Sequence, residues 1–311
     1  MSRPAKARRR VAVVTGAAGG LGTEFVAALR SRGYEVTGAD LSGADVVLDV
    51  TDADACRRLA RELRPDVWIN NAGVVGAGSA IEQSDAEIRR TVEVNLMGVI
   101  YGTRAAVEVM REHGSGTVLN VASLASFTPL PGEAVYAATK HAVRAFTLGV
   151  GYELRGTGVR LTTLCPDGIR TPMLGGILDD PAMALVFSSG RLLEPRPVAE
   201  LGVRLIESPR FGPLASIPRY RGVLARVLGI APRLFLFLAP LLELIGRRTQ
   251  ARLQASVRSS AGFSRSPLAT APASGPAGKG TSKVATVTGS SRSASSASAC
   301  SRCFAVSSPP R

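Results

Sequence analysis

The chain has 311 residues, 45% of them hydrophobic, which is enough for one large domain or two small ones. Its formal net charge of +14 lies mostly in the two ends, because residues 1–10 and 251–311 carry basic side chains and no acidic ones. The residues between them are nearly neutral. This excludes the basic face that a nucleic-acid-binding domain would carry, so no nucleic-acid partner is expected.

The cysteines and the N-terminus favour a cytoplasmic protein. Cys56 and Cys165 fall in apolar or helical surroundings and are predicted to be buried thiols. Cys300 and Cys303 form a lone C-x-x-C pair with no second pair and no histidine nearby, so we expect no zinc site and no metal. The apolar run from Val11 to Val14 is much shorter than the core of a secretory signal.

A nucleotide-binding pattern opens the chain. Val11 to Thr15 is a short, β-branched apolar run typical of a buried parallel strand. A glycine-rich turn over residues 16–22 follows directly, and then an apolar helical pattern that ends at Gly33. A strand, a glycine-rich turn and a helix in this order aim backbone N–H groups at a pyrophosphate. We therefore predict a dinucleotide site here, although such a turn can also be only a tight connection.

Asp40 follows the second predicted strand, Glu35 to Ala39. A carboxylate at this place accepts hydrogen bonds from the hydroxyls of an adenosine ribose and repels a 2′-phosphate. Neither the glycine loop nor the residues directly after Asp40 contain Arg or Lys. Both observations favour NAD over NADP as the cofactor. The alternative is an aspartate that caps a turn.

The following segments alternate between strand and helix patterns. Further strands are expected at residues 46–50, 67–70, 117–121, 159–164 and 212–217, and helices at 54–63, 85–112, 136–154 and 196–208. Such alternation predicts an α/β fold with a Rossmann-like, doubly wound parallel sheet of about seven strands. Ligands bind outside the carboxyl ends of such strands. Five polar or turn residues fall at these ends: Gly16, Asp40, Asn71, Ser123 and Pro166.

Tyr136 and Lys140 are four residues apart, so they lie on one face of the predicted helix. A phenol titrates near pKa ~10, and a nearby cation lowers that pKa toward the range of a useful general acid/base. Alone, this pair is also compatible with an aromatic anchor beside a solvated lysine.

Taken together, these motifs resemble the short-chain dehydrogenase/reductase family over about residues 10–218. They stand in family order: T-G-x-x-x-G-x-G at 15–22, N-N-A-G at 70–73, Asn95, Ser123 and Y-x-x-x-K at 136–140. One departure is Pro166-Asp167-Gly168, where the family usually has Pro-Gly. For that reason no family role is carried over to Asp167.

The resemblance implies a catalytic tetrad and a set of cofactor contacts. Tyr136 would be the acid/base, and Ser123 would hydrogen-bond the substrate oxygen. Lys140 would hold the nicotinamide ribose and lower the pKa of Tyr136, and Asn95 would kink its helix and position a proton-relaying water. The implied cofactor contacts are Gly16, Gly20, Leu21, Gly22, Asp40, Asp49, Val50, Asn71, Ala72, Gly73, Tyr136, Lys140, Pro166 and Thr171.

The expected substrate loop, residues 171–195, is mostly apolar. Its large apolar side chains are Met173, Leu174, Ile177, Leu178, Met183, Leu185, Val186 and Phe187. An apolar loop favours an apolar secondary alcohol or ketone such as a lipid, steroid or terpenoid, unless these side chains pack on the protein itself. We expect an alcohol dehydrogenase or ketone reductase. The alternative is a nucleotide-binding or membrane-associated lipid-handling protein without efficient turnover.

The dehydrogenase domain is predicted to span residues 11–218, after a basic N-terminal tail over 1–10. Residues 219–255 are expected to form an apolar extension of two short helices. Within it, residues 223–248 would cover the pocket, a partner subunit or a membrane surface, touching the membrane peripherally without spanning it. Residues 256–311 are rich in Ser, Ala and Pro and are predicted to be disordered. A homo-oligomer that pairs through helices 85–112 and 136–155 is also expected.

Overall fold

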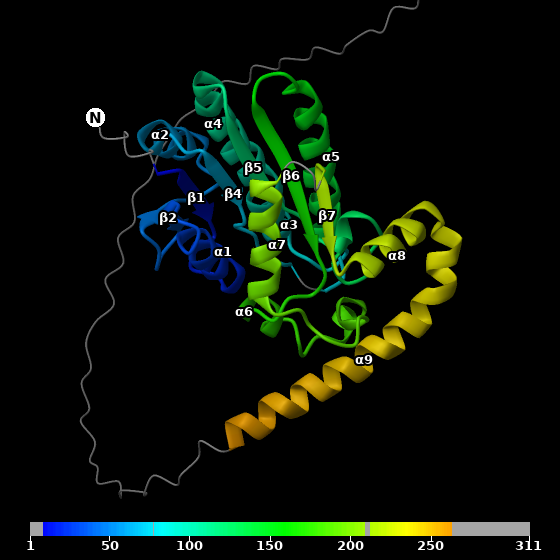
Figure 1. The fold of residues 1–311 in the computed structure, drawn as a ribbon. Coiled ribbons are helices and arrows are strands. Elements are labelled where there is room, and N and C mark those ends of the chain that lie inside the picture. Colours follow the sequence, from blue (N-terminus) through cyan, green and yellow to red (C-terminus); the bar gives the residue numbers. More distant parts are fainter. Residues whose placement is uncertain (1–8, 77, 209–211, 263–311) are drawn as a thin grey trace, which may run out of the picture. The chain divides into compact units, whose positions relative to one another are not determined.

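The computed structural model describes residues 9–76, 78–208 and 212–262. Seven parallel strands form one sheet in the order β3-β2-β1-β4-β5-β6-β7 (Figure 1). The strands are β1 (Val11–Thr15), β2 (Glu35–Asp40), β3 (Val46–Val47), β4 (Val67–Asn70), β5 (Gly116–Val121), β6 (Val159–Pro166) and β7 (Leu214–Ile217). Strands are added toward one edge of the sheet from β1 to β3 and toward the other edge from β4 to β7. This switch between β1 and β4 opens a crevice at the carboxyl ends of the two strands. The predicted doubly wound, Rossmann-like α/β fold is confirmed.

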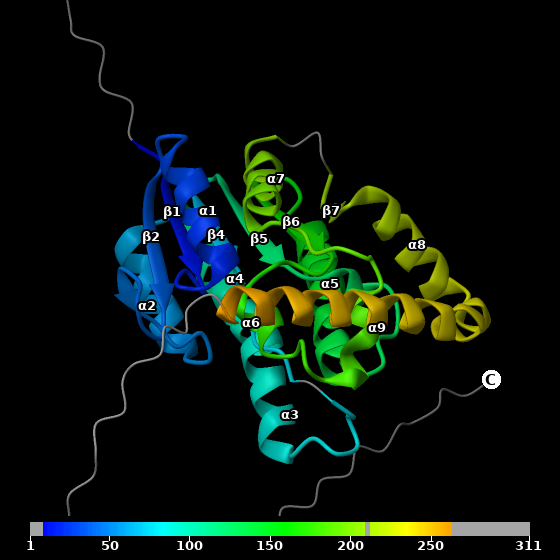
Figure 2. The same cartoon turned by 90° about the horizontal axis from the view of Figure 1, so that it is seen from below.

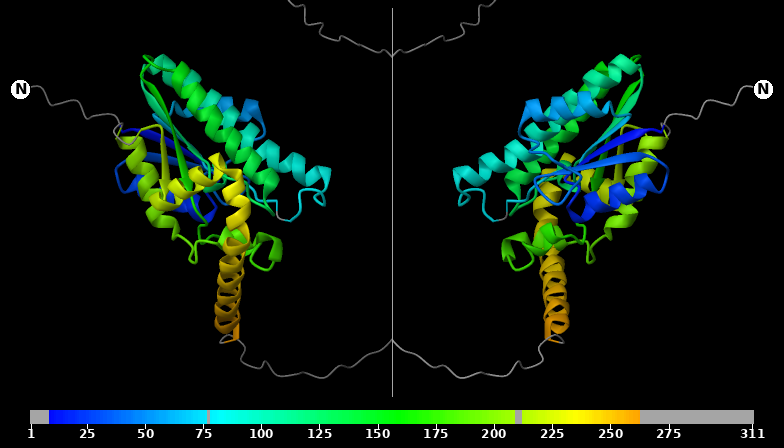
Figure 3. Two further views of the ribbon diagram at one scale, coloured as in Figure 1. Left: turned by 90° about the vertical axis from the view of Figure 1, so that its right-hand side faces the viewer. Right: turned by 90° about the vertical axis from the view of Figure 1, so that its left-hand side faces the viewer.

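Helices cover both faces of the sheet (Figures 1 and 3). They are α1 (Gly20–Arg30), α2 (Ala53–Leu63), α3 (Asp85–Val92), α4 (Gly98–His113), α5 (Ala134–Glu153) and α7 (Pro195–Glu207). Ala12 and Val14 face a buried cluster with α1 and α7, whereas Val13 faces a second cluster with α2, α4 and the end of α5. This alternation along β1 is the period of two that side chains have in a strand, so both faces of the sheet are buried.

A buried chain of amides ties the central strands to the helices that carry the site. The Asn70 side chain on β4 donates to Asn120 Oδ1 on β5 at 2.8 Å, and Asn120 Nδ2 donates to Thr147 Oγ1 on α5 at 2.9 Å. Trp68 Nε1 donates to Asn70 Oδ1 at 2.8 Å. Because buried polar groups are costly unless they are paired, this chain of bonds sets the position of α5 relative to β5.

Two expected elements differ in detail. The third strand is only two residues long, because Asp49 turns the chain by accepting hydrogen bonds from the Thr51 N–H and hydroxyl. The expected helix over 85–112 is interrupted by a π-helical turn, η1 (Glu93–Met97), between α3 and α4. Cys56 and Cys165 are buried free thiols, as predicted.

The C-terminal extension forms α8 (Arg219–Ile230) and α9 (Pro232–Gly262), which differs from the two short helices expected within 219–255. The second helix has 31 residues and continues through Pro240. It packs along the 3-10 helix η3 (Pro181–Phe187) of the substrate loop, and Gln250 Nε2 donates to the Asp180 carbonyl at 2.9 Å. Phe235 before Pro240 and Gln250 after it both contact this loop, so the packing holds the helix on either side of the proline. Figure 2 shows the full length of α9 from below.

The helix also corrects the predicted start of the disordered tail, because residues 256–262 belong to α9. The rest of that predicted tail, 263–311, and residues 1–8 of the predicted basic tail lie outside the described residues. Within the part of the chain that the structure describes, none of the helices combines the length and apolarity that a bilayer crossing requires.

Candidate active site

The glycine loop joins β1 to α1 at the carboxyl edge of the sheet. Asn71, just past β4, donates through Nδ2 to the carbonyls of Thr15 and Gly16 at 3.1 and 3.0 Å, which ties the loop to the neighbouring strand. A Cβ atom at Gly22 would lie 2.0 Å from the Gly16 carbonyl oxygen, so α1 can approach the loop this closely only with glycine there. Gly22 does not line the cavity described below. In this structure its role is to allow α1 to approach the glycine loop.

Asp40 ends β2 beside that loop. Its carboxylate accepts hydrogen bonds from the Ala18 N–H at 3.0 Å and from the Leu41 N–H at 2.8 Å. The first of these bonds holds the end of β2 against the glycine loop. Asp49 and the largely buried Val50 follow β3 on the same side of the pocket. These residues form one end of the site.

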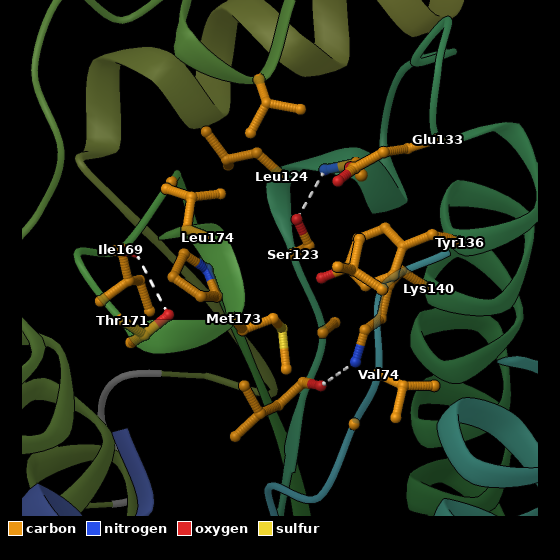
Figure 4. Close-up of a pocket in the computed structure, with 18 of the residues that line it drawn as sticks. Val74, Ser123, Leu124, Glu133, Tyr136, Lys140, Ile169, Thr171, Met173 and Leu174 are labelled. Atoms are coloured by element: carbon orange, nitrogen blue, oxygen red, sulfur yellow. Dashed lines mark hydrogen bonds between the residues drawn. The ribbon is translucent and has the colours of Figure 1, made fainter. Parts of the chain in front are cut away.

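Ser123, Tyr136 and Lys140 form its centre (Figure 4). Tyr136 and Lys140 lie one turn apart on α5, and Ser123 follows β5 as the N-cap of the 3-10 helix η2 (Leu124–Ser126). Lys140 is 4% exposed, its Nζ donates to the Val121 carbonyl at 3.0 Å, and it lies 5.5 Å from the Tyr136 ring centroid. The fold thus brings together three residues that the sequence predicted as neighbours.

Burial dominates the protonation of this group. Burial raises the pKa of Tyr136 well above its ordinary value, the charge of Glu133 raises it further, and a hydrogen bond with Ser123 lowers it. Burial lowers the pKa of Lys140 to about 8, whereas Cys165 and Glu133 oppose this. The expected lowering of the Tyr136 pKa by Lys140 does not occur among the protein groups alone, because both side chains are desolvated and the ammonium is turned to the Val121 carbonyl.

Asn95 lies in the π-helical turn η1 and is fully buried. Its Oδ1 accepts from the Val74 N–H and its Nδ2 donates to the Val74 carbonyl, both at 2.8 Å. A Cβ at Gly73 would lie 3.2 Å from Asn95 Oδ1 and 3.8 Å from Lys140 Nζ, so Gly73 separates the two side chains. Asn95 therefore holds the segment after β4 in place and does not itself line the cavity. The irregular helix expected at this residue is present.

Asp167, which was given no role from the sequence, forms a largely buried ion pair. Arg221 of α8 donates to its carboxylate at 2.9 Å and to the Ser188 hydroxyl at 3.0 Å. The two charged side chains are 10% and 15% exposed. This pair joins the C-terminal extension to the end of β6, next to Pro166. No sequence signal connected Arg221 with Asp167, because 54 residues separate them.

A cavity of about 570 Å³ connects these groups, a volume in the range of small-molecule sites. The predicted site residues that line it are Gly16, Gly20, Leu21, Asp40, Asp49, Val50, Asn71, Ala72, Gly73, Ser123, Tyr136, Lys140, Pro166 and Thr171. Near Ser123 the lining is mainly apolar. In the described residues no cluster of His, Cys, Asp and Glu is suited to hold a metal ion.

The substrate loop divides between lining and packing. Met173, Leu174, Ile177, Leu185 and Val186 line the cavity, whereas Met183 and Phe187 are fully buried in a cluster beneath it. Both alternatives from the sequence therefore apply, to different side chains. The C-terminal extension supplies a further wall, which the sequence offered only as one of three alternatives for the extension. Its residues are Arg221, Leu224, Ala225, Leu228, Phe235 and Leu242. Residues 223–248 were expected to cover the pocket, a partner subunit or a membrane surface, and they cover at least the pocket.

Known proteins are similar to this chain in sequence and in fold. The sequence is 34% identical over 204 residues to a 2-(R)-hydroxypropyl-CoM dehydrogenase of Xanthobacter autotrophicus, covering 56% of this chain and 80% of the relative. It is 31% identical over 219 residues to a 3-alpha-(or 20-beta)-hydroxysteroid dehydrogenase of Mycobacterium bovis, covering 63% and 82%. An actinorhodin polyketide ketoreductase solved with NADPH matches with a TM-score of 0.62 and 26% identity, over 69% of this chain and 97% of that one.

The family model described as short chain dehydrogenase matches residues 10–182, more than half of the chain. That segment contains the glycine loop, Ser123, Tyr136 and Lys140. The protein is therefore an oxidoreductase that belongs to the short-chain dehydrogenase family, whose members use NAD or NADP.

Proposed function

We propose that this enzyme transfers a hydride between nicotinamide and the carbinol carbon of an apolar secondary alcohol or ketone, with Tyr136 as the general acid/base. The observation that carries the proposal is one cavity that joins the glycine loop and Asp40 to Ser123, Tyr136 and Lys140 and then continues between apolar walls. Two relatives are named as dehydrogenases of hydroxy compounds, which supports a secondary alcohol as substrate, and the hydroxysteroid named for one of them is apolar.

The residues of the loop fit a dinucleotide. The N-cap of α1, Gly19, makes no side-chain cap bond, and Gly20 and Leu21 of the first turn line the cavity. Such an uncapped helix start offers N–H groups and the positive end of the helix dipole to a pyrophosphate. The nicotinamide, when bound, would supply or accept the hydride.

The side chains around Ser123 would manage the proton. Tyr136 would pass its phenolic proton to a carbonyl oxygen, or take one from an alcohol, while the Ser123 hydroxyl donates to that oxygen. Lys140, whose pKa of about 8 lets it release and regain a proton close to neutral pH, would hold a ribose hydroxyl and replenish the proton on Tyr136. Asn95 would support that relay indirectly, by holding Val74 and the adjacent Gly73 in place beside Lys140.

The test is Tyr136→Phe, which removes only the hydroxyl. We expect turnover of secondary alcohols to fall by about 10² to 10⁴-fold, the usual contribution of a general acid/base, while NADH affinity, followed by its fluorescence, stays within about twofold. Loss of NADH binding with turnover preserved would contradict the assigned role.

We further propose that NAD is preferred over NADP. The Asp40 carboxylate would accept bonds from ribose hydroxyls and repel a 2′-phosphate, and a solved relative with NADPH makes the comparison worth measuring. Asp40→Ser should raise kcat/KM with NADPH relative to NADH by at least about tenfold, which corresponds to ~1.4 kcal/mol. Asp54→Ser is the control, because Asp54 is an exposed acid of α2 that does not line the cavity. A wild-type enzyme that works better with NADPH would refute the preference.

Peripheral membrane contact is also proposed, on the strength of one face of α9. We call this the α9 outer face, and it comprises Leu236, Phe237, Leu241 and Leu244 with Arg233, Arg247, Arg248 and Arg252 beside them. The four apolar side chains are exposed, and the arginines stand before and after them. An apolar stripe flanked by basic residues is typical of helices that lie in an anionic lipid surface.

The expected homo-oligomer rests on α5. The side of α5 that faces away from the sheet exposes two large apolar side chains one turn apart, Leu148 and Tyr152. We propose that two copies pair there, and light scattering at micromolar concentration tests it.

A further inference from the structure

Glu133 is a buried acid at the active centre. It directly precedes α5, three residues before Tyr136, it is 4% exposed, and it lines the cavity. Figure 4 shows its carboxyl group and the Tyr136 phenol reaching toward Ser123 from the same side of the pocket. No sequence motif singled out this glutamate, and the predicted helix began only at Tyr136.

The carboxyl group of Glu133 is unpaired. It makes no capping bond to α5, and among the described residues it has no hydrogen-bonding or ion-pair partner. Burial raises its pKa to about 8, which the charge of Lys140 partly opposes, so near neutrality it is largely a carboxylic acid with one donor and one acceptor. Burying such a group without a partner costs free energy that a bound ligand can recover.

The backbone next to Glu133 packs against the substrate loop. Gly132 has a φ of +85°, and a Cβ there would lie 2.3 Å from the Ala182 carbonyl oxygen of η3. The Glu133 N–H donates to the Leu130 carbonyl at 3.0 Å. The loop over residues 128–133 is therefore locked against the substrate loop, and the acid is held toward the cavity.

A second polar group of the same loop is also unpaired. Thr128 lines the cavity, and its buried Oγ1 has no hydrogen-bond partner among the described residues. The other charged groups of this region are satisfied, since Arg221 pairs with Asp167 and Lys140 donates to Val121. Thr128 and Glu133, two cavity-lining residues whose polar side-chain groups have no partner among the described residues, thus lie on one loop.

We propose that Glu133 and Thr128 form a subsite that hydrogen-bonds a second oxygen of the substrate, a hydroxyl or carbonyl close to the reacting carbon. This inference rests on the proposed function and narrows its substrate class. The preferred substrates are apolar hydroxyketones, or the corresponding diols in the oxidative direction. The oxygen lies close to the reacting carbon because Glu133 and Tyr136 stand within one helical turn of each other.

The experiment compares matched ketones that share a carbon skeleton and differ only by a neighbouring hydroxyl. The wild-type enzyme is expected to favour the hydroxyketone in kcat/KM by at least about 10²-fold, since a site built to hydrogen-bond an OH rejects the analogue without it. Glu133→Leu should reduce that ratio to near one and use the plain ketone at least as well as the wild type does. Glu133→Gln, which keeps a donor and an acceptor, should retain part of the ratio.

Two further variants complete the test. Thr128→Val, which has the same shape, should also lower the ratio, so the proposal can be checked even if Glu133→Leu does not fold. Glu82→Leu replaces an exposed acid that does not line the cavity and should leave the ratio unchanged.

A failure of the subsite and a failure of the proposed function give different results. A wild-type ratio near one, or a ratio that both Glu133→Leu and Thr128→Val leave unchanged, would overturn the subsite while Tyr136-dependent turnover remains. Absence of turnover with every secondary alcohol and ketone, despite NADH binding, would instead refute the proposed function and the subsite with it.

Discussion

The acid and base groups at the centre of the pocket are shifted in opposite directions by one cause. Burial favours neutral forms, so the pKa of Lys140 falls to about 8, that of Glu133 rises to about 8, and that of Tyr136 rises above its ordinary value. A neutral phenol is the form that donates a proton to a carbonyl oxygen. At the scale of single residues, burial therefore keeps the phenol of Tyr136 in its neutral, proton-donating form.

These shifts predict how stability depends on pH. The pKa of Glu133 rises from 4.5 unfolded to about 8 folded, so between these values the folded state holds a proton that the unfolded state has released. The free energy of unfolding then decreases as pH rises through this window. Glu133→Gln has no such loss. The difference between its melting temperature and that of the wild type should therefore shift in favour of the variant as pH rises from about 5 to about 8.

Lys140 is the charged group that acts on Glu133, and the two titrations are coupled, because Glu133 also raises the pKa of Lys140. Removing the carboxyl group lowers the Lys140 pKa further, which shifts the relative stability of the variant in the same direction as pH rises. Glu82→Gln, which alters an exposed acid, serves as the control and should follow the wild type at every pH. A difference between Glu133→Gln and the wild type that does not change with pH would contradict the buried, unpaired carboxyl group.

At the scale of elements, the extension is part of the catalytic domain rather than an appendage. α8 packs against β7 and η2, and α9 packs along η3. Phe235 of α9 and Leu228 of α8 share a buried cluster with Leu185 of the substrate loop. The Arg221–Asp167 pair holds the start of α8 to the end of β6. The wall of the pocket is thus built from segments on both sides of the last strand.

That ion pair predicts a stability difference. Arg221→Met would leave Asp167 buried without its partner, which typically costs about 3–5 kcal/mol. Arg170→Met is the control, because Arg170 pairs with Glu194 at 3.0 Å but the two side chains are 55% and 61% exposed. Exposed pairs contribute about 0–1 kcal/mol. Denaturant unfolding of the two variants measures both values, and equal losses would show that burial does not set the strength of the pair.

At the scale of the whole molecule, α9 has two opposed faces. Phe235 and Leu242 turn inward to the cavity, whereas the α9 outer face turns away from the protein. The exposed residues Val223, Val227 and Ile230 of α8 add to the apolar surface at that end. If this surface rests on lipid, an apolar substrate would reach the pocket beside the helix that forms its wall.

Vesicle binding tests that contact. The wild-type protein should co-sediment with vesicles that contain phosphatidylglycerol, bind less to pure phosphatidylcholine, and release in high salt, since anionic lipid attracts the arginines. Phe237→Glu should lower the bound fraction at least about fivefold, because it places a charge in the apolar face. Ile81→Glu is the matched control, because Ile81 is 94% exposed but lies far along the chain, before α3.

Light scattering on the same samples distinguishes lipid from a second copy of the chain. Binding to neither vesicle, together with a Phe237→Glu variant of lower mass than the wild type, would assign the α9 outer face to an interface between copies and overturn the membrane proposal.

The sequence by itself determined the features that depend on local patterns. Strand and helix periodicities predicted the parallel sheet, and parallel topology alone brought Gly16, Asp40, Asn71 and Ser123 to one edge. Turn spacing placed Tyr136 beside Lys140. The tertiary structure decided what depends on contacts between distant segments: the Asp167–Arg221 pair, the continuation of α9 through Pro240, and the unpaired state of Glu133. Desolvation and pairing are properties of the packed chain, so no local pattern could reveal that Glu133 is buried or that burial outweighs Lys140 at Tyr136.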